Sequence, residues 1–431
     1  MRDILKIYVP VILLVIGGFV FAWQFVDPAP SKTVTVATGA ADGAYSASAR
    51  DYQKLLAQSG ITLNIRHTSG TVENLRLLAD PKSGVDLAFV QSGVGSPSLQ
   101  NGVATPGASS DLVSLASVFL EPLWVFVRAE AAPARLSGLK GKRIAVGAEG
   151  SGTKVLTLQL LAASGVTEKN STLLAMSGND GAKALEAGRV DAAVFVTGRV
   201  SETMNRLLRD PRVRLLDFVR ADAYKAHFGY LARVTLPEGV LALDTNIPPA
   251  PVSLVAPTAT LVARDDLHPA IVDLVLGAAT KVHQPGSVFS PPGAFPSPNQ
   301  VDFPLSEDAR RYFKSGPTFL RRVLPFWLAV MVERLLIMLV PLVTLLIPLM
   351  KIAPAAYDWN IQRKLQSRYR ELRLLEGRFR ADDTPATRAA LAARLEAMQK
   401  ETASLKVPLS YAERLYHLRT HIDLMRRIVA G

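Results

Sequence analysis

Residues 33–45 read Thr-Val-Thr-Val-Ala-Thr-Gly-Ala-Ala-Asp-Gly-Ala-Tyr, a short apolar run followed by a glycine-rich turn. The run Thr33–Ala37 is typical of a strand, and Ser46–Leu56 then has the pattern of a helix. A strand that leads through a glycine-rich turn into a helix is the repeating unit of α/β sheets. This stretch therefore indicates an α/β fold.

The same unit recurs along the chain. In a first half we expect strands at 63–66 and 86–90 and a helix at 72–78; in a second half, strands at 124–127, 143–146 and 192–196 and helices at 154–163, 181–187 and 201–208. The proline-rich segment 247–257 and a strand at 260–263 lead back to the first half, and 268–282 reads as a helix. The pattern predicts largely parallel sheets in two lobes, lobe 1 at about 31–122 and 250–320 and lobe 2 at about 123–249.

Two apolar runs suggest membrane segments. No charged residue lies between Ile7 and Phe25, which is close to the ~20 residues that cross a bilayer. We expect an anchor within 1–30, with a cleaved secretory signal as the alternative. A second run, strongest over Leu335–Met350, predicts a transmembrane helix within 321–356, with a buried core helix as the alternative.

The charge distribution sets the expected topology. The 431 residues carry a net charge of +12, but residues 351–431 hold 16 basic and 9 acidic side chains and residues 31–320 are nearly balanced. Basic residues gather on the cytoplasmic side of membrane segments, so we expect a cytoplasmic tail at 357–431, both termini inside and residues 31–320 outside the inner membrane. The charge is then a topology signal, and no nucleic-acid partner is expected.

The composition excludes several functional classes. The chain contains no cysteine, which excludes disulfides, thiolate zinc sites, a cysteine nucleophile and a lipid-bearing N-terminal cysteine. His417 and His421 have a spacing that could hold a metal, but no further ligand set stands near them in sequence, and a solvated helix face is the alternative. A hydrolase using Ser151 would need a histidine and an aspartate that no motif supplies. We therefore expect no catalytic residue, metal or cofactor.

Three polar turns are candidates for a ligand site. They lie at 38–45, 67–71 and 147–153, each after an expected strand. In open α/β sheets, ligands bind beyond the carboxyl ends of strands, where helix N-termini favour anions. Each turn alone could be an ordinary helix cap. The turn at 147–153 resembles a phosphate loop, but Lys154 follows Thr153, so nucleotide binding is not expected.

The segments that carry these turns resemble the TAXI solute-binding proteins of TRAP transporters. The resemblance covers about residues 33–316 and includes the motifs at 68–75, 86–91, 150–153, 187–193 and 309–316. It implies a two-lobed periplasmic-binding-protein fold (type II-like) that closes on a small organic anion, such as glutamate, another acidic amino acid, a 2-oxo acid or a dicarboxylate. It also implies TRAP membrane subunits as partners.

The resemblance implies a set of ligand-binding residues. These are Gly39, Ala44, Tyr45, Ser69, Gly70, Thr71 and Gln91 from the first lobe and Ser151, Gly152, Thr153, Phe195 and Thr197 from the second. Two features depart from the family pattern: Ser46 stands where many members have a second aromatic residue, and this chain has an expected membrane segment at each end of the receptor.

The tail shows three apolar stripes with spacings of three and four residues. They run from Ile361 to Phe379, from Leu391 to Leu405 and from Leu415 to Val429, which is typical of coiled-coil-like helices. Thr384 and Pro385 are suited to the N-cap and first position of the second helix. We expect a self-packed helical element that anchors or self-associates; the alternative is a partner-binding element that makes the protein a ligand sensor.

Overall fold

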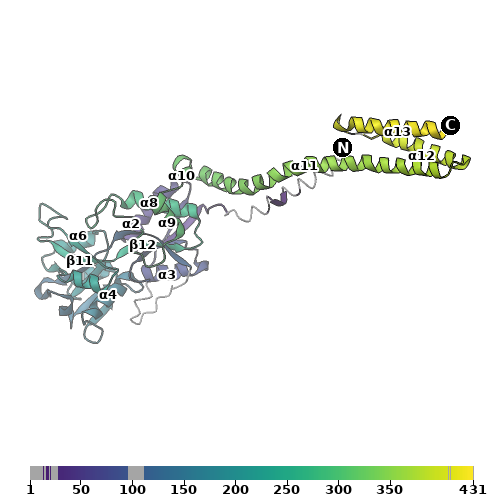
Figure 1. The fold of residues 1–431 in the computed structure, drawn as a ribbon. Coiled ribbons are helices and arrows are strands. Elements are labelled where there is room, and N and C mark those ends of the chain that lie inside the picture. The colour runs from purple at the N-terminus through teal and green to yellow at the C-terminus, as the bar shows by residue number, and fades with distance from the viewer. Residues whose placement is uncertain are drawn as a thin grey trace. The chain divides into compact units, whose positions relative to one another are not determined.

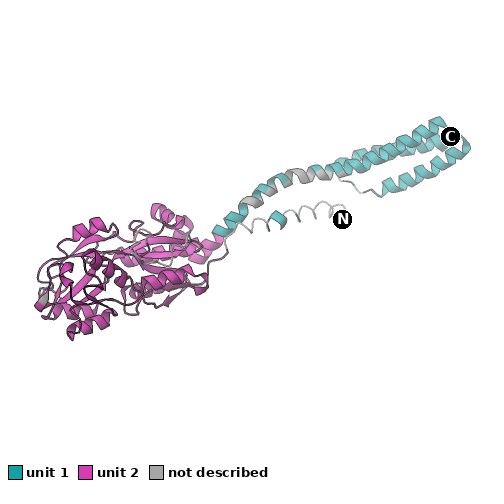
Figure 2. Ribbon diagram, turned by 90° about the horizontal axis from the view of Figure 1, so that it is seen from below, with its two compact units in different colours: residues 1–27, 333–431 teal, residues 28–332 magenta. Residues whose placement is uncertain are grey.

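The computed structural model describes residues 28–95, 111–405, 407 and 409–430, together with positions 13, 16–18 and 20. The chain divides into two compact units, residues 28–332 and residues 1–27 with 333–431, which are coloured separately in Figure 2. Each unit is described by itself. The anchor predicted within 1–30 falls almost entirely outside the described residues.

The first lobe of the 28–332 unit is built on a five-stranded sheet. Its strand order is β2 (Thr62–Arg66), β1 (Thr33–Ala37), β3 (Leu87–Gln91), β12 (Thr258–Arg264) and β4 (Leu112–Leu120). β2, β1 and β3 are parallel, whereas β12 runs antiparallel to both β3 and β4. The helices that belong to this lobe are α2 (Ala44–Ala57), α3 (Thr71–Ala79), α8 (Pro269–His283) and α9 (Glu307–Ser315), labelled in Figure 1.

The second lobe repeats this plan. Its sheet has the order β7 (Thr172–Ala175), β6 (Arg143–Gly147), β8 (Ala192–Val196), β5 (Leu123–Arg128) and β9 (Val213–Leu215). Its helices are α4 (Gly152–Ala163), α5 (Gly178–Glu186), α6 (Glu202–Arg209) and α7 (Ala221–His227). The antiparallel pair β10 (Ala232–Leu236) and β11 (Val252–Ala256) completes it.

The two lobes exchange their return strands. β4 ends at Leu120 in the first lobe and β5 begins at Leu123 in the second; β11 ends at Ala256 in the second and β12 begins at Thr258 in the first. The two connections touch, because the amide of Glu121 donates to the carbonyl of Pro257 at 2.9 Å. Two short connections side by side form a hinge.

The prediction of largely parallel sheets is confirmed, with one antiparallel strand in each sheet. β12 runs antiparallel to both of its neighbours in the first lobe, and β5 does so in the second, while the other four strands of each sheet run in one direction. The physical reason is the strand exchange. β5 and β12 enter their sheets from the opposite lobe, and they run against the strands that were recognised from sequence.

Each lobe has its own apolar core. Trp124 and Phe126 of β5 are fully buried in the second, and Phe89 of β3 and Tyr52 of α2 in the first. All five residues of β3 are buried, as expected for a strand covered on both faces. At ~25 cal/mol per Å² of apolar surface, burial of these large side chains holds each sheet to its helices.

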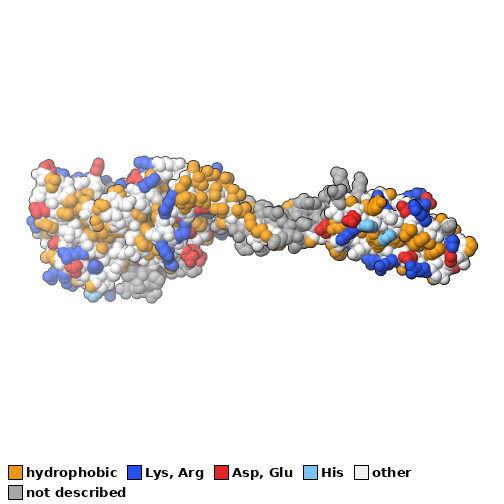
Figure 3. Space-filling view, turned by 45° about the horizontal axis from the view of Figure 1, so that its top comes forward, with side chains coloured by type: hydrophobic (Ala, Val, Ile, Leu, Met, Phe, Trp, Pro, Cys, Tyr) orange, Lys and Arg blue, Asp and Glu red, His pale blue; other side chains and the backbone are white. Residues whose placement is uncertain are grey.

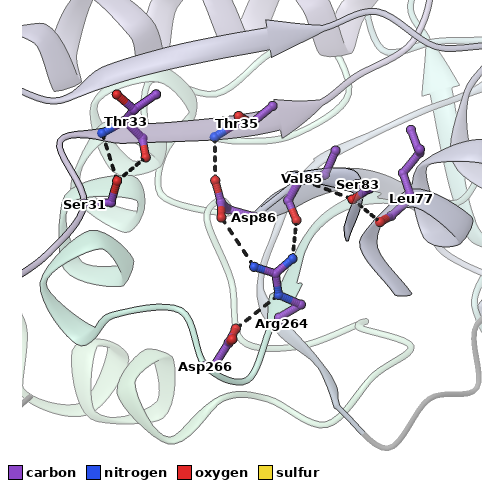
Figure 4. A network of polar contacts seen from close by, with 9 residues as sticks. All are labelled: Ser31, Thr33, Thr35, Leu77, Ser83, Val85, Asp86, Arg264 and Asp266. Carbon is purple, nitrogen blue, oxygen red and sulfur yellow. Dashed lines mark hydrogen bonds and ion pairs between the residues drawn. The ribbon is translucent and has the colours of Figure 1, made fainter. Parts of the chain in front are cut away.

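One polar network fixes the strand ends of the first lobe (Figure 4). Arg264, at the end of β12, donates to the carbonyl of Val85 at 2.7 Å and pairs with Asp86 at 3.5 Å. Asp86 in turn accepts the amide of Thr35 in β1 at 2.7 Å. The network ties β1, β3 and β12 together at the amino end of β3, so the opposite, carboxyl end is left to the polar loops.

The other unit contains a three-helix element. α11 (Phe326–Ala381) enters this unit at residue 333, and α12 (Pro385–Ala403) and α13 (Ala412–Ala430) follow it. The three predicted stripes meet in one core, with Leu395, Met398, Leu418 and Ile422 fully buried. Thr384 is the N-cap of α12 and accepts the amide of Thr387 at 3.4 Å. The prediction of a self-packed helical element is confirmed by this core.

The second membrane prediction is not supported. Among the residues that the structure describes, no helix combines the length and the apolarity of a membrane span. The stretch predicted to cross lies within α11. Figure 3 shows basic and acidic side chains mixed on the visible face of α11–α13.

Candidate ligand-binding cleft

A cavity of about 1150 Å³ lies between the two lobes of the 28–332 unit. It is lined at the N-termini of five helices, α2 and α3 from the first lobe and α4, α5 and α6 from the second. The first amides of a helix have no acceptor within it and the dipole is positive at that end. The cavity is therefore surrounded by groups that stabilise negative charge.

Asn74 holds the loops of the first lobe in place. Its side chain is fully buried in α3, and its amide donates to the carbonyl of Thr38, after β1, and to that of Phe89, in β3, the latter at 2.8 Å. Its oxygen accepts the hydroxyl of Thr68 at 2.6 Å. One side chain thereby joins the turns at 38–45 and 67–71 to the end of β3.

Gln91 links the end of β3 to both lobes. Its amide donates to the hydroxyl of Thr71 at 3.0 Å, and its side-chain nitrogen donates to the carbonyl of Gly152 in α4 at 3.2 Å. The amide of Val72 also donates across the cleft, to the carbonyl of Gly150 at 3.2 Å. The lobes are therefore in direct contact at this side of the cavity, which is the closed arrangement of a two-lobed receptor.

The helices of the second lobe begin with serine caps. Ser151, Ser177 and Ser201 each accept the amide three residues ahead, at 3.2, 3.2 and 3.3 Å. Ser151 also donates its hydroxyl to the carbonyl of Ala148 at 2.6 Å. These caps fix the starts of α4, α5 and α6 at the cavity wall.

The hinge contributes a buried acid to the cavity. Glu121 lies in the β4–β5 connection, lines the cavity and is only 3% exposed. The hydroxyl of Tyr45 donates to its carboxyl at 2.7 Å, and the Tyr45 ring stacks on Phe89 with centroids 5.2 Å apart. Burial raises the pKa of Glu121 to about 8, and burial also raises the pKa of Tyr45 well above its usual value.

Charged and amide side chains close the rim. Arg50 and Arg199 both line the cavity; Arg50 donates to the carbonyl of Ala41 at 3.0 Å, and Arg199 of the second lobe pairs with Asp51 of the first at 3.8 Å. The side chain of Asn179 in α5 donates to Asp42 at 2.8 Å. The last two contacts join one lobe to the other.

The structure brings all of the sequence-predicted site residues together. Gly39, Ala44, Tyr45, Ser69, Gly70, Thr71, Gln91, Ser151, Gly152, Thr153, Phe195 and Thr197 all line this one cavity. Their role in binding a ligand stays a prediction. Ser46, the departure from the family pattern, is not among the lining residues; it is buried and contacts Thr38 at 3.0 Å and His67 at 3.1 Å.

Sequence reasoning missed several lining residues. Examples are Arg50, Glu121, Ser177, Asn179 and Arg199. Glu121 had a readable signal, because it is the only charged residue between 112 and 127. The Ser177 and Ser201 turns follow strands in the same way as the three turns that were recognised.

The alternative chemistries find no matching geometry within the described residues. The Ser151 hydroxyl is committed to a helix cap, and no histidine is among the residues that line the cavity. No cluster of three or more potential metal ligands occurs in the described part of the chain. His417 is exposed on α13, with its ring nitrogen 3.7 Å from Glu413.

Comparison with known proteins gives a family and distant structural neighbours. A model of the NMT1-like family matches residues 36–286, which is more than half of the chain. No curated protein sequence matches significantly.

Solved structures overlap this chain only in part. The alkanesulfonate-binding protein SsuA from Xanthomonas axonopodis pv. citri, bound to MOPS, is 18% identical, with 59% of this chain and 74% of that chain covered and a TM-score of 0.35. SsuA from Escherichia coli, a periplasmic aliphatic sulphonate binding protein, is 16% identical, with 59% and 73% covered and a TM-score of 0.38. An ancestral arginine-binding protein bound to arginine is 13% identical, with 60% and 95% covered and a TM-score of 0.36.

Proposed function

The chain belongs to the NMT1-like family, and on this premise we propose that it is a solute receptor that binds a small organic anion between its two lobes. The carrying observation is the cavity itself: polar loops and five helix N-termini from two hinged lobes converge on one space. Such a site binds by closure and leaves its ligand unchanged. An enzymatic function is not part of the proposal.

The ligand class follows from the electrostatics of the wall. The first turns of α3 and α4 meet across the cleft at Thr71 and Gly152, and each presents amides that suit a carboxylate or a similar anion. Arg50 and Arg199 add positive charge at the rim. We take an acidic amino acid, a 2-oxo acid or a dicarboxylate as the ligand class.

The finer proposal concerns delivery. The motifs at 68–75, 86–91 and 150–153 resemble those of TAXI receptors, so we assign the protein to a TRAP-type secondary transporter. In that role the 28–332 unit acts outside the cytoplasm and passes its ligand to membrane subunits. Co-purification of the full-length protein with multi-spanning TRAP subunits would support this assignment, and recovery of another class of transporter would contradict it.

Calorimetry with the full-length protein tests the receptor function. We expect one ligand per chain with micromolar affinity for at least one small organic anion. Gln91→Ala removes the side chain that joins β3 to α4 and should weaken binding by roughly tenfold, the equivalent of one buried hydrogen bond. Gln53→Ala is the matched control, since Gln53 bonds only to Leu63 in the described structure and does not line the cavity. A folded protein that binds no small organic anion would contradict the proposal.

A second candidate function rests on the tail. The α11–α13 element has a core of its own, which includes Leu395, Leu418 and Ile422. Such an element suits a ligand sensor that acts on a cytoplasmic partner. Capture of one specific protein by the full-length chain, and its loss in Tyr416→Ala, where the side chain is 70% exposed, would favour this second function.

A further inference from the structure

We infer that the ligand carries an ammonium group beside its anionic group, and that the Glu121 carboxyl is the acceptor of that ammonium. This inference rests on the proposed receptor function and narrows its ligand class to α-amino acids. It begins from the position of one acidic side chain at the hinge between the lobes.

Glu121 is a buried acid without a basic partner. Its side chain lines the cavity, yet the residue is 97% shielded from solvent. Within the described part of the chain, the hydrogen bonds and ion pairs of its carboxyl include Tyr45 and no lysine or arginine. A carboxyl buried without a cation keeps its proton, and it ionises at low cost only when a counter-charge enters the cavity beside it.

The cations of the cavity wall are held elsewhere. Arg50 donates to the carbonyl of Ala41, and Arg199 pairs with Asp51 on the other lobe. Lys154, just beyond the start of α4, pairs with Glu149. The protein therefore leaves the hinge carboxyl for a cation that the ligand supplies.

The two ends of an α-amino acid match two parts of this wall. Its carboxylate suits the N-termini of α3 and α4, as proposed above, and its ammonium suits the hinge carboxyl, which lines the same cavity. A 2-oxo acid or a dicarboxylate brings no cation to replace the proton of Glu121, and it can only accept a hydrogen bond from the protonated carboxyl. The wall thus favours a zwitterion over an anion of the same length.

Binding of an ammonium also changes the protonation of the hinge acid. Because burial raises the pKa of Glu121 to about 8, this carboxyl is largely neutral at pH 7 in the closed arrangement. An ammonium beside it favours the carboxylate, so the proton is released on binding. The other titratable groups that line the cavity are Asp42, Tyr45, Arg50, Arg199 and Glu202.

The test is calorimetry of the full-length protein with matched ligands at pH 7. α-Amino acids are each paired with the 2-oxo acid of the same side chain, beginning with L-glutamate, 2-oxoglutarate and the amine-free glutarate. We expect the amino acid to bind at least about tenfold more tightly than its 2-oxo partner. In two buffers of different ionisation enthalpy, only the amino acid should release close to one proton, a result that needs no variant.

Variants assign the preference to the residue. Glu121→Gln keeps the size of the side chain and should weaken amino-acid binding by roughly ten- to a hundredfold while leaving the 2-oxo acid nearly unaffected. Glu121→Asp keeps the charge and should retain the preference if the Gln variant fails to fold. Glu168→Gln, at an exposed position outside the cavity, is the matched control and should bind as the wild type does.

The outcomes separate this inference from the proposed function. Equal or tighter binding of the 2-oxo acid or glutarate, or an amino-acid preference that survives in Glu121→Gln, overturns the inference and leaves the receptor function standing. Absence of binding by every member of the panel to the folded protein overturns both.

Discussion

The two lobes share one strand order but start the helices that line the cleft differently. In each sheet four strands run in one direction, and the fourth strand in the order, β12 or β5, runs against them. In the second lobe, α4, α5 and α6 begin at Ser151, Ser177 and Ser201, whose side chains cap them. In the first lobe, α2 and α3 begin at Gly43 and Gly70, which have no side chain to cap with.

Because of this difference, the two lobes contribute differently to the cleft. In the second lobe, a serine side chain of the same lobe accepts one first-turn amide of each of these helices. The first lobe gives one amide of α3, that of Val72, to the carbonyl of Gly150 on the other lobe. It shares with the hinge the buried polar groups Gln91 and Glu121 and the partly buried Tyr45. Closure therefore supplies an acceptor for the start of α3, whereas α4, α5 and α6 each have an acceptor within their own lobe.

The largest expected effect concerns the hinge acid. The pKa of Glu121 is raised to about 8, so between about pH 4.5 and pH 8 the folded protein holds a proton that the unfolded chain has lost. The stability from this group is therefore full below the unfolded pKa and falls as the pH rises through 8. Glu121→Gln should remove this loss. Between pH 5 and pH 8, the free energy of urea unfolding should therefore fall by a few kcal/mol more in the wild type than in Glu121→Gln, on the order expected for a pKa shift of this size. Parallel pH profiles would contradict the assignment.

The next effect concerns the contact between Gly152, at the start of α4, and the first lobe. A Cβ at Gly152 would come within 2.8 Å of Gln91 and 3.0 Å of Thr71. Gly152→Val should prevent closure and weaken ligand binding by roughly ten- to a hundredfold, in line with overpacking costs of about 1–3 kcal/mol. Gly229→Ala, where a Cβ meets nothing within 4 Å, is the control for calorimetry. Unchanged binding in Gly152→Val would mean that the lobes do not meet here in the bound state.

The caps of the second lobe allow a smaller test. Ser151→Ala removes the side-chain acceptor for the amide of Lys154 and should lower the free energy of unfolding by about 1 kcal/mol. The same test cannot be made at Gly43, because this N-cap residue of α2 has no side chain to remove. Chemical denaturation measures the change, and Thr384→Ala, the N-cap of α12, gives the size of the same loss outside the 28–332 unit. A Ser151→Ala protein as stable as the wild type would remove the contrast between the lobes.

The smallest effect belongs to the rim. Asn179 donates to Asp42 across the cleft, and this bond is exposed to solvent. Asn179→Ala should weaken ligand binding by about two- to threefold, since an exposed hydrogen bond contributes about 0.5 kcal/mol. Calorimetry resolves this change, and a loss above about tenfold would show instead that Asn179 contacts the ligand.

Much of the fold was legible from short strand, turn and helix units. β1 and β8 have the predicted bounds, and α4 begins two residues before its predicted start. β4 was missed because Leu112–Leu120 is a nearly continuous buried run without alternation. The direction of β5 and β12 was not legible either, because it depends on strand exchange between lobes and not on local pattern.

The site was legible where it follows the ends of parallel strands. The turns after β1 and β6 and the start of α3 were recognised and line the cavity. Glu121 was not recognised, because its importance comes from the hinge, where β4 passes from one lobe to β5 in the other. Local sequence does not show which connection between strands will line the cleft.

Lobe closure on a small organic ligand is the central claim, and a distance measurement tests it most directly. The chain has no cysteine, so spin labels can be placed at Lys54→Cys in α2 and Arg209→Cys in α6 without background, both at exposed positions. The account predicts that a saturating ligand from the amino-acid panel shortens and narrows the distribution of distances between the labels, and that Gly152→Val abolishes this change. A distribution that stays the same while calorimetry shows the ligand bound would contradict closure as the mode of binding.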